Sequence, residues 1–351
     1  MAVASVYCWQ QHEKNFRLCK HNLLLMHILI VHNSFLPALK YGGIERAIWW
    51  LGKRLVAEGH KVSYLVSKGS YCPFADVHVY DTTVPFNTLI PPGVDVVHLS
   101  TGTNEMPLKP YIAMVQTNMD HQLPLNLNTV FVSANHAARY GSSVFVHNGL
   151  DPEDYGTPDF AGKKKYIHFL GDAAWRVKNV TGAIKVAAMA KIPLRVIGGV
   201  RFNFNQGIRL SFNPKTRFEG MKGGAEKNEL LKNSAAMLFP VRWHEPFGIA
   251  IIESLYFGCP VFGTPYGSLP EIVIPGVGFL SNKSKELAAA LQHIGDYDRR
   301  HCHNYVMENF TATKMAAGYM QLYQKVLEGK TLNAVAPQLV TLPKEKFLYF
   351  N

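Results

Sequence analysis

The chain has 351 residues, of which 48% are hydrophobic and 17% charged, and this composition is typical of a globular protein rather than a disordered one. Its best apolar run, Leu23–Val31, is interrupted by His27 and is shorter than the ~18–20 residues that a spanning helix needs, so the sequence predicts no such helix. The five cysteines show no Cys-x-x-Cys spacing, which disfavours a zinc site and a disulfide framework and favours a reducing cytoplasm.

The formal net charge of +11 raises the hypothesis of a nucleic-acid or membrane partner. Residues 26–150 carry 8 Lys and Arg against 7 Asp and Glu, whereas residues 151–330 carry 23 against 16, so the excess lies in the second half. It is spread out, the only tight cluster being Lys163-Lys164-Lys165, and no basic run is interleaved with aromatic residues. We therefore expect no nucleic acid as partner, and we leave peripheral contact with an anionic membrane open.

Residues 1–25 lack the order of charge, apolar core and cleavage site that a signal peptide has. Met26 directly precedes a strand pattern that would open an α/β domain. We interpret Met26 as the start of the folded protein, and residues 1–25 as an extension that is loose or not native.

From Met26 onward, strand and helix patterns alternate, which is typical of parallel sheets covered by helices. In the first half the helix pattern begins after Gly42-Gly43 and ends at Gly59, and residues 67–93 are rich in turns. The strands predicted there are His27–His32, Lys61–Val66, Val94–Leu99, Tyr111–Thr117, Thr129–Ser133 and Ser143–His147.

A second alternating series follows the polar stretch Pro152–Gly162. Its predicted strands are Tyr166–Leu170, Leu194–Ile197, Arg217–Glu219 and Met237–Pro240, and its predicted helices are Val180–Ala190, Ala225–Asn233, Lys285–Ile294 and Ala312–Leu327. Neither a G-x-G-x-x-G motif after a strand nor a Walker A motif is present, which disfavours a dinucleotide-dependent oxidoreductase.

The most informative stretch is Trp243–Pro270. Glu245 lies in a loop that enters a helix beginning near Gly248, and Glu253 lies inside that helix, which Gly258 would end. The free amides at the helix N-terminus suit a phosphate, and a glycine there lets a ligand approach the backbone closely.

This stretch resembles the donor-site signature of the retaining glycosyltransferases of family four. The matching residues are Trp243, Glu245, Pro246-Phe247-Gly248, Glu253, Gly258-Cys259-Pro260-Val261 and Gly267-Ser268-Leu269-Pro270-Glu271. The resemblance implies the GT-B fold, an α/β architecture of two Rossmann-like domains facing each other across a cleft, with ligands at the carboxyl ends of the strands. We predict an N-terminal acceptor domain over residues 26–158, a C-terminal donor domain over 159–327 whose final helix crosses back to the first domain, and a tail over 328–351.

The resemblance also implies roles for individual residues. Lys178 would bind the donor diphosphate, Glu245 the hydroxyls of the transferred sugar and Glu253 the ribose. The remaining implied contacts to the donor come from the backbone of Gly42, Gly43, Phe247, Gly248 and Ile249 and, near the base, from Met221. The family needs no cofactor and generally no metal.

This sequence departs from the family pattern at three positions. Asp172 stands where an arginine usually contributes to diphosphate binding, and we expect Arg176 to supply that charge. In the family's His-x-His pattern only His98 is present, with Ser100 in place of the second histidine. His98 is therefore a candidate catalytic residue, a core histidine being the alternative, and Gln116 replaces a further histidine on the next strand.

The interpretation is a cytoplasmic, retaining, metal-independent glycosyltransferase. It would move a hexose from a UDP-sugar to a glycan or lipid-linked acceptor in bacterial surface polysaccharide biosynthesis. Two alternatives stay open: a catalytically weak nucleotide-sugar binding protein, motivated by Asp172, Ser100 and Gln116, and a GT-B sugar-nucleotide epimerase.

Overall fold

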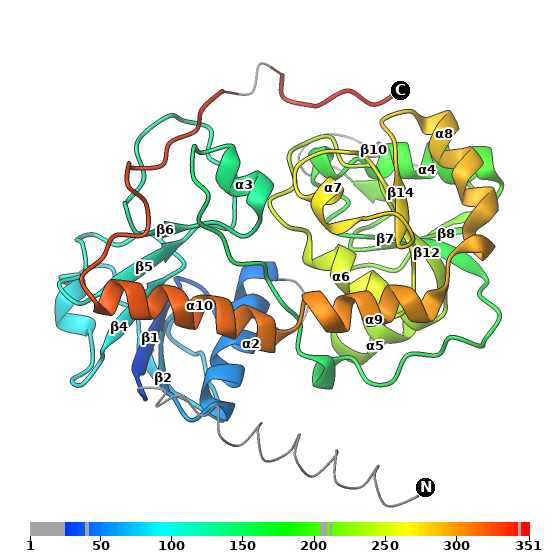
Figure 1. The fold of residues 1–351 in the computed structure, drawn as a ribbon. Helices are drawn as coiled ribbons and strands as arrows, with labels where there is room; N and C mark the ends of the chain where they lie inside the picture. The colour runs from blue at the N-terminus through cyan, green and yellow to red at the C-terminus, as the bar shows by residue number, and fades with distance from the viewer. Residues whose placement is uncertain (1–24, 39–41, 204–208, 211–212, 343–344) are drawn as a thin grey trace, which may run out of the picture.

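The computed structural model describes residues 25–351 except 39–41, 204–208, 211–212 and 343–344, so the N-terminal extension lies outside the described residues apart from Leu25. Two six-stranded parallel sheets, one in each half of the chain, stand side by side (Figure 1). Helices flank both sheets, which is the arrangement that fully buried parallel strands require.

The sheet of the N-terminal half has the order β3-β2-β1-β4-β5-β6. Its strands are β1 His27–Val31, β2 Lys61–Val66, β3 Asp76–Val79, β4 Val96–Leu99, β5 Tyr111–Met114 and β6 Thr129–Val130. The main helix of this half is α2 (Gly43–Ala57), with the short α3 (Ala134–Ala138) after β6 and a 3₁₀ turn, η1, at Phe86–Leu89. The two central strands β1 and β4 are buried along their whole lengths.

The last two strands predicted for this half differ from those observed. The strand predicted at Thr129–Ser133 ends at Val130, and the one predicted at Ser143–His147 does not form. These two segments meet at a single bridge between Phe131 and Phe145, where Phe131 exchanges hydrogen bonds with Val144 and Val146. This short pairing gives hydrogen-bond partners to the backbone groups of Phe131, but it is not long enough to form a strand.

The sheet of the C-terminal half has the order β11-β8-β7-β12-β13-β14, and a separate hairpin pairs β9 (Phe202–Asn203) with β10 (Arg209–Leu210). The sheet strands are β7 Tyr166–Leu170, β8 Leu194–Ile197, β11 Thr216–Phe218, β12 Ser234–Phe239, β13 Val261–Gly263 and β14 Gly278–Leu280. The helices are α4 Val180–Ala190, α5 Gly224–Lys232, α6 Ile249–Tyr256, α7 Leu269–Ile272, α8 Ser284–Ala290 and α9 Arg299–Asn309, with 3₁₀ turns η2 Pro152–Asp154, η3 Arg176–Lys178 and η4 Leu291–Asp296.

Helix α9 was not predicted, because its sequence is almost wholly polar and only Cys302 and Val306 are buried. It packs against α6 of the C-terminal half, whereas the next helix, α10 (Ala312–Leu327), packs against α2 and β5 of the N-terminal half (Figure 1). The chain returns between them at a bridge from Thr311 to Leu150.

The tail after α10 holds no helix or strand among its described residues and lies across both halves (Figure 1). On the N-terminal half the Pro337 carbonyl accepts from the Leu125 amide, Leu339 is buried and the Val340 amide donates to the Arg139 carbonyl. On the C-terminal half the Leu348 amide donates to the Arg242 carbonyl, and Asn351 exchanges backbone bonds with Asn282 and Ser284.

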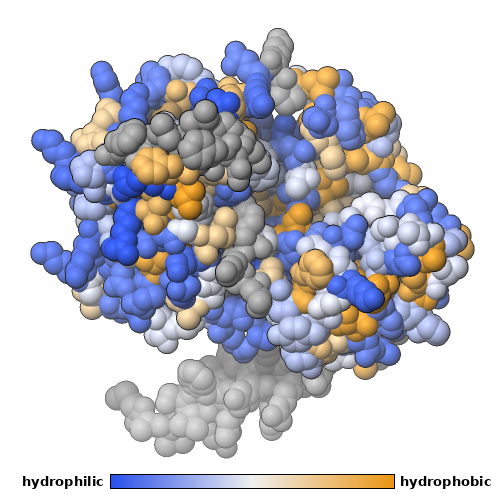
Figure 2. Space-filling model, turned by 180° about the vertical axis from the view of Figure 1, so that it is seen from behind, coloured by the Kyte–Doolittle hydropathy of each residue, from blue (hydrophilic) through white to orange (hydrophobic). Residues whose placement is uncertain are grey.

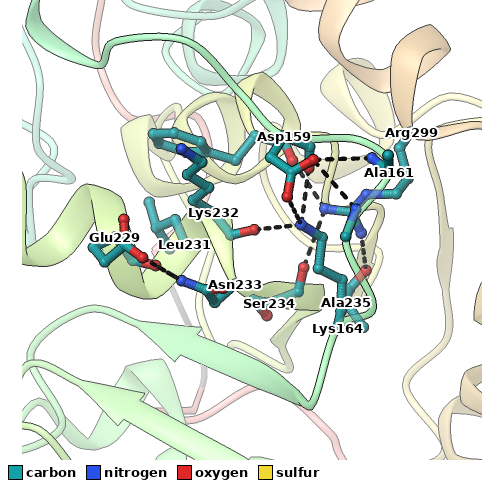
Figure 3. Close-up of polar contacts among 12 residues, drawn as sticks. Asp159, Ala161, Lys164, Glu229, Leu231, Lys232, Asn233, Ser234, Ala235 and Arg299 are labelled. Carbon is teal, nitrogen blue, oxygen red and sulfur yellow. Dashed lines mark hydrogen bonds and ion pairs between the residues drawn. The ribbon is translucent and has the colours of Figure 1, made fainter.

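The basic triplet at residues 163–165 is not a set of three solvated charges. The Lys164 ammonium donates to the carbonyls of Asp159 and Lys232, each at 2.8 Å, and ties the connecting segment to the end of α5 (Figure 3). Beside it, Arg299 donates to the Ser234 carbonyl at 3.2 Å and to the Ala235 carbonyl at 3.3 Å. This cluster therefore stabilises the fold.

No helix among the described residues is long and apolar enough to cross a membrane. On the described part of the face shown in Figure 2, hydrophilic and hydrophobic side chains are interspersed over both halves. The described part of this face shows no continuous apolar band.

Candidate functional site

A cavity of about 350 Å³ lies between the two halves, where the carboxyl ends of their strands face each other. The N-terminal half contributes the segments after β1 and β5, and the C-terminal half contributes the segments after β7, β8 and β12. In parallel α/β sheets this is where ligands bind. Charged side chains that line the cavity are Glu45, Arg46, Lys178, Lys222, Lys227, Glu245 and Glu253.

The loop that carries Glu245 is held by the glycine and serine that follow β13. A Cβ on Gly267 would lie 2.2 Å from the Glu245 amide nitrogen, so only glycine allows this approach. The Ser268 amide donates to the Glu245 carbonyl at 2.9 Å, and its hydroxyl donates to the Phe247 carbonyl at 2.6 Å. The Gly267-Ser268 pair therefore sets the direction of the Glu245 side chain.

Helix α6 begins at Ile249, directly after Gly248, whose φ of 89° lies in the left-handed region that favours glycine. Its N-terminus lines the cavity, and the glycine loop of the other half lies against it. A Cβ on Gly43 would be 3.7 Å from Ile249 Cδ1, which is ordinary contact. The amide end of α6 therefore faces the crevice between the halves.

In the lining of the cavity Glu245 pairs with Lys178. Lys178 Nζ lies 2.6 Å from Glu245 Oε2, and the Trp243 indole N–H donates to the same oxygen at 2.8 Å. The ammonium also lies 4.7 Å from the centre of the Trp243 ring and 5.3 Å from that of Phe239. Both charged side chains are nearly buried, so aromatic rings and one carboxylate hold the lysine in place.

A separate group of contacts surrounds Glu253, which is 1% exposed and has three side-chain partners. Arg46 from α2 and Lys227 from α5 both form ion pairs with its Oε1, and the Tyr155 hydroxyl donates to the same atom at 2.7 Å. Burial would raise the pKa of this carboxyl, but the charges and hydrogen bonds of Arg46 and Lys227 outweigh burial and lower its pKa to about 2.

All of these contacts reach Oε1. Among the described residues no side chain or amide forms a hydrogen bond with the second oxygen, Oε2. Oε2 also does not belong to the side-chain atoms that are fully buried without a hydrogen-bond partner. Because Glu253 lines the cavity, its Oε2 is available to a hydroxyl of a ligand.

Nine of the eleven residues implied by the resemblance line this one cavity: Gly42, Gly43, Lys178, Met221, Glu245, Phe247, Gly248, Ile249 and Glu253. The structure does not bring the other two, Arg176 and His98, to the cavity.

Arg176 does not take the place of the missing arginine in this structure. It is exposed, and its guanidinium lies over the Phe347 ring of the tail, 5.1 Å from the ring centre. Asp172 accepts from the Ala174 amide at 2.8 Å and so closes the loop that turns Arg176 outward. The expectation that Arg176 supplies charge at the site is therefore corrected.

His98 is fully buried beneath α10. Its Nδ1 lies 2.6 Å from the Tyr323 hydroxyl, and its ring packs 4.8 Å from that of Tyr319. Burial lowers the pKa of His98 to about 3, so it is neutral at physiological pH. It is not placed to touch a ligand, and the core alternative describes its surroundings better than the catalytic one.

The sequence reasoning missed Arg46, Lys227 and Tyr155. Each lies in a segment whose pattern indicates a solvated surface: Arg46 in the first turn of α2, Lys227 in the polar helix α5, and Tyr155 in the polar connection before β7. The one available signal was the position of Arg46, three residues after Gly43, at the start of a helix that faces the cleft.

No group of three or more His, Cys, Asp or Glu side chains in the described part of the chain could hold a metal ion. His301 and His303 are close in sequence, but His303 Nδ1 lies 2.6 Å from the Tyr256 carbonyl oxygen.

Comparison with solved structures identifies the fold class. AviGT4, a glycosyltransferase involved in avilamycin A biosynthesis, matches with a TM-score of 0.72 and 20% identity over 87% of this chain and 99% of its own. Anabaena Alr3699/HepE, solved in complex with UDP and glucose, matches with a TM-score of 0.62 and 14% identity over 85% of this chain and 99% of its own. At these identities the likeness establishes the fold, which is GT-B as predicted.

Comparison of the sequence gives partial matches. Residues 152–305 match the family described as "Glycosyl transferases group 1". A Klebsiella pneumoniae protein, described as an uncharacterized 41.2 kDa protein in cps region, is 26% identical over 148 residues, and this match spans 40% of each chain. The family match covers less than half of this chain, and it includes the segments that carry Lys178, Glu245 and Glu253.

Proposed function

We propose that this protein is a retaining, metal-independent glycosyltransferase that moves a hexose from a UDP-sugar to a glycan or lipid-linked acceptor. The observation that carries the proposal is that Glu245, Glu253 and Lys178 line one crevice together with the N-terminus of α6. Two carboxylates, with fixed positive groups between the halves, fit a molecule that has hydroxyls at both ends and a diphosphate in the middle.

In this proposal the ribose hydroxyls bind Glu253 through its free Oε2. The diphosphate lies by the amide end of α6. There Lys178 offsets the negative charge that develops on the diphosphate as it leaves the sugar. Arg46 and Lys227 bring two positive charges to the Glu253 carboxylate, and this surplus compensates for the missing arginine at position 172.

Glu245 binds hydroxyls of the transferred sugar. An acceptor hydroxyl attacks the anomeric carbon on the face from which the diphosphate departs. The bond from that carbon to the phosphate oxygen breaks as the new glycosidic bond forms, and the hydroxyl proton passes to the leaving phosphate. The configuration at the anomeric carbon is thereby retained without a nucleophile from the protein.

The setting we propose is assembly of a bacterial surface polysaccharide at the cytoplasmic side of the membrane. Support comes from the cps-region relative, which shares 148 aligned residues, and from Alr3699/HepE, solved with UDP and glucose. The net charge of +11 is compatible with contact to anionic lipid.

A second candidate is a nucleotide-sugar binding protein with weak catalysis. The observation that favours it is the short Lys178–Glu245 pair, which occupies both groups with each other. One experiment separates these candidates and the epimerase: UDP-, GDP- and ADP-sugars are screened by thermal shift, and the stabilising sugar is then incubated while UDP release and sugar epimerisation are followed by NMR. No stabilisation by any nucleotide sugar would overturn the donor site.

A further inference from the structure

A second cavity, of about 680 Å³, lies on the far side of the loop that carries Glu245. Its walls come from three places: helix α3 with Arg139 of the N-terminal half, His244 of the C-terminal half, and six residues of the tail, namely Val340, Thr341, Leu342, Glu345, Leu348 and Tyr349. In Figure 1 the described parts of the tail run past α3 and end above α7.

Arg139 is the charged group that distinguishes this cavity. It is partly buried, and no carboxylate of the described residues lies within ion-pair distance of it. Its Nη1 donates to Asn118 Oδ1 at 2.5 Å, and the Asn118 amide donates to the His244 carbonyl at 2.7 Å. The guanidinium is therefore oriented by neutral groups and keeps its charge uncompensated.

The surrounding groups do not supply a counter-ion. Burial and then the charge of Arg139 lower the pKa of His244 to about 4, so this imidazole is neutral and can donate or accept a hydrogen bond. Asn135 adds an amide. The one carboxylate among the described lining residues, Glu345, is exposed and lies on the tail.

The second cavity adjoins the cavity between the two halves, called the donor cavity here because it contains the proposed donor site. Two pairs of neighbouring residues connect the two cavities. Thr117 lines the donor cavity and Asn118 binds Arg139, while Glu245 lines the donor cavity and His244 lines the second one. A ligand that bridges the two cavities would pass this contact, with its reacting hydroxyl at Glu245 and its far end at Arg139.

We propose that the second cavity binds the acceptor, and that the acceptor carries an anionic group, a phosphate or a carboxylate, at a distance from the hydroxyl that reacts. The inference rests on the proposed function, since only a transferase has an acceptor. A planar guanidinium with free N–H groups binds phosphate and carboxylate oxygens in pairs. The neutral amides and imidazole beside it suit the hydroxyls of a sugar.

The test is made on the full-length protein with UDP at saturation, so that the donor cavity is filled. Inorganic phosphate, sodium glucuronate and uncharged glucose are titrated by calorimetry at constant ionic strength. We expect phosphate or glucuronate to bind, and Arg139→Gln to weaken that binding by about 10- to 100-fold, since a hydrogen-bonded charge pair is lost. The matched control is Arg300→Gln, which removes one positive charge from an exposed position on α9 and leaves anion binding unchanged.

A second variant, Thr341→Trp, fills the cavity from the tail and keeps the charge of Arg139, and it should also abolish binding. The affinity for UDP is measured in every variant and reports an intact fold. If wild type binds UDP but binds no anion, or if Arg139→Gln binds anions as well as wild type, the inference is wrong and the donor proposal stands. If wild type does not bind UDP, the donor proposal itself fails.

Discussion

Removal of one of the two cations at Glu253 is the sharpest test of the site. Lys227→Met keeps the length of the side chain, which is 6% exposed, and deletes the ammonium that pairs with Glu253 Oε1. Of the donors among the described residues, the carboxylate then keeps Arg46 and Tyr155, in a site where it is 1% exposed. A buried charge that loses a partner is destabilising, because it cannot recover the lost interaction from water.

The expected loss of unfolding free energy follows from the lowered pKa of the Glu253 carboxyl. A pKa that falls from 4.5 to about 2 corresponds to about 3 kcal/mol in favour of the ionised folded form, at about 1.4 kcal/mol per pH unit. Because Arg46 and Lys227 also overcome the opposing effect of burial, their joint contribution exceeds this net value, and Lys227→Met should cost at least about 1.5 kcal/mol and up to about 3 kcal/mol.

The sign of the pH dependence is set by the lowered pKa. Because the folded pKa lies below the unfolded one, this stability is present above pH 4.5 and is lost as the pH falls toward 2. The difference in unfolding free energy between variant and wild type should therefore be smaller at pH 3 than at pH 7.

The assay is urea unfolding followed by tryptophan fluorescence at both pH values. The control, Lys222→Met, removes an ammonium whose partner, Glu226, is 70% exposed, and it should change the unfolding free energy by no more than about 0.5 kcal/mol. Equal stability of Lys227→Met and wild type at pH 7, or equal losses in the two variants, would refute the account of Glu253.

The remaining predictions concern catalysis and the loop. Lys178→Ala and Glu253→Ala should each lower kcat/KM for the nucleotide sugar by ~10²–10³, since a charged hydrogen bond near a phosphate contributes about 2–4 kcal/mol; unchanged turnover in both would remove these residues from the site. Arg176→Gln should leave kcat/KM within about twofold of wild type, because its side chain lies over Phe347 outside the cavity, and a large loss would show that it reaches the donor in the bound state. Gly248→Ala should lower the unfolding free energy by about 1–2 kcal/mol, because its φ is 89° and a Cβ would lie 2.7 Å from an Ile251 methyl, and thermal melting that matches wild type would contradict the left-handed conformation at this position.

Much of the fold could be predicted from local patterns. The strands Lys61–Val66, Tyr166–Leu170 and Leu194–Ile197 and the helices Val180–Ala190 and Ala312–Leu327 have the bounds that the sequence indicated. Each has a strong apolar period and clear terminating residues, so local energetics and tertiary packing favour the same state. Helix α9 was missed because its burial is too slight to leave a period in the sequence, and the buried strand β13 (Val261–Gly263) was missed because three residues are too few to show one.

The two glutamates that line the cavity between the halves could also be predicted, because they lie, with the glycines and the serine near them, in one stretch of 26 residues from Glu245 to Pro270. A constellation built within one short stretch leaves its pattern in that stretch. The contacts of both glutamates, however, are completed by residues from distant parts of the chain.

Only the tertiary structure decided which charges meet. Arg46 and Glu253 are 207 residues apart and come from different halves, and Arg176, close to Lys178 in sequence, turns outward onto the tail. His98 carries the residue type of a catalytic base, yet α10 covers it after crossing from the other half. A sequence shows which residue types are available in each segment, whereas burial and charge pairing depend on contacts made across the fold, and these determine whether a charged side chain binds a ligand, a neighbour or water.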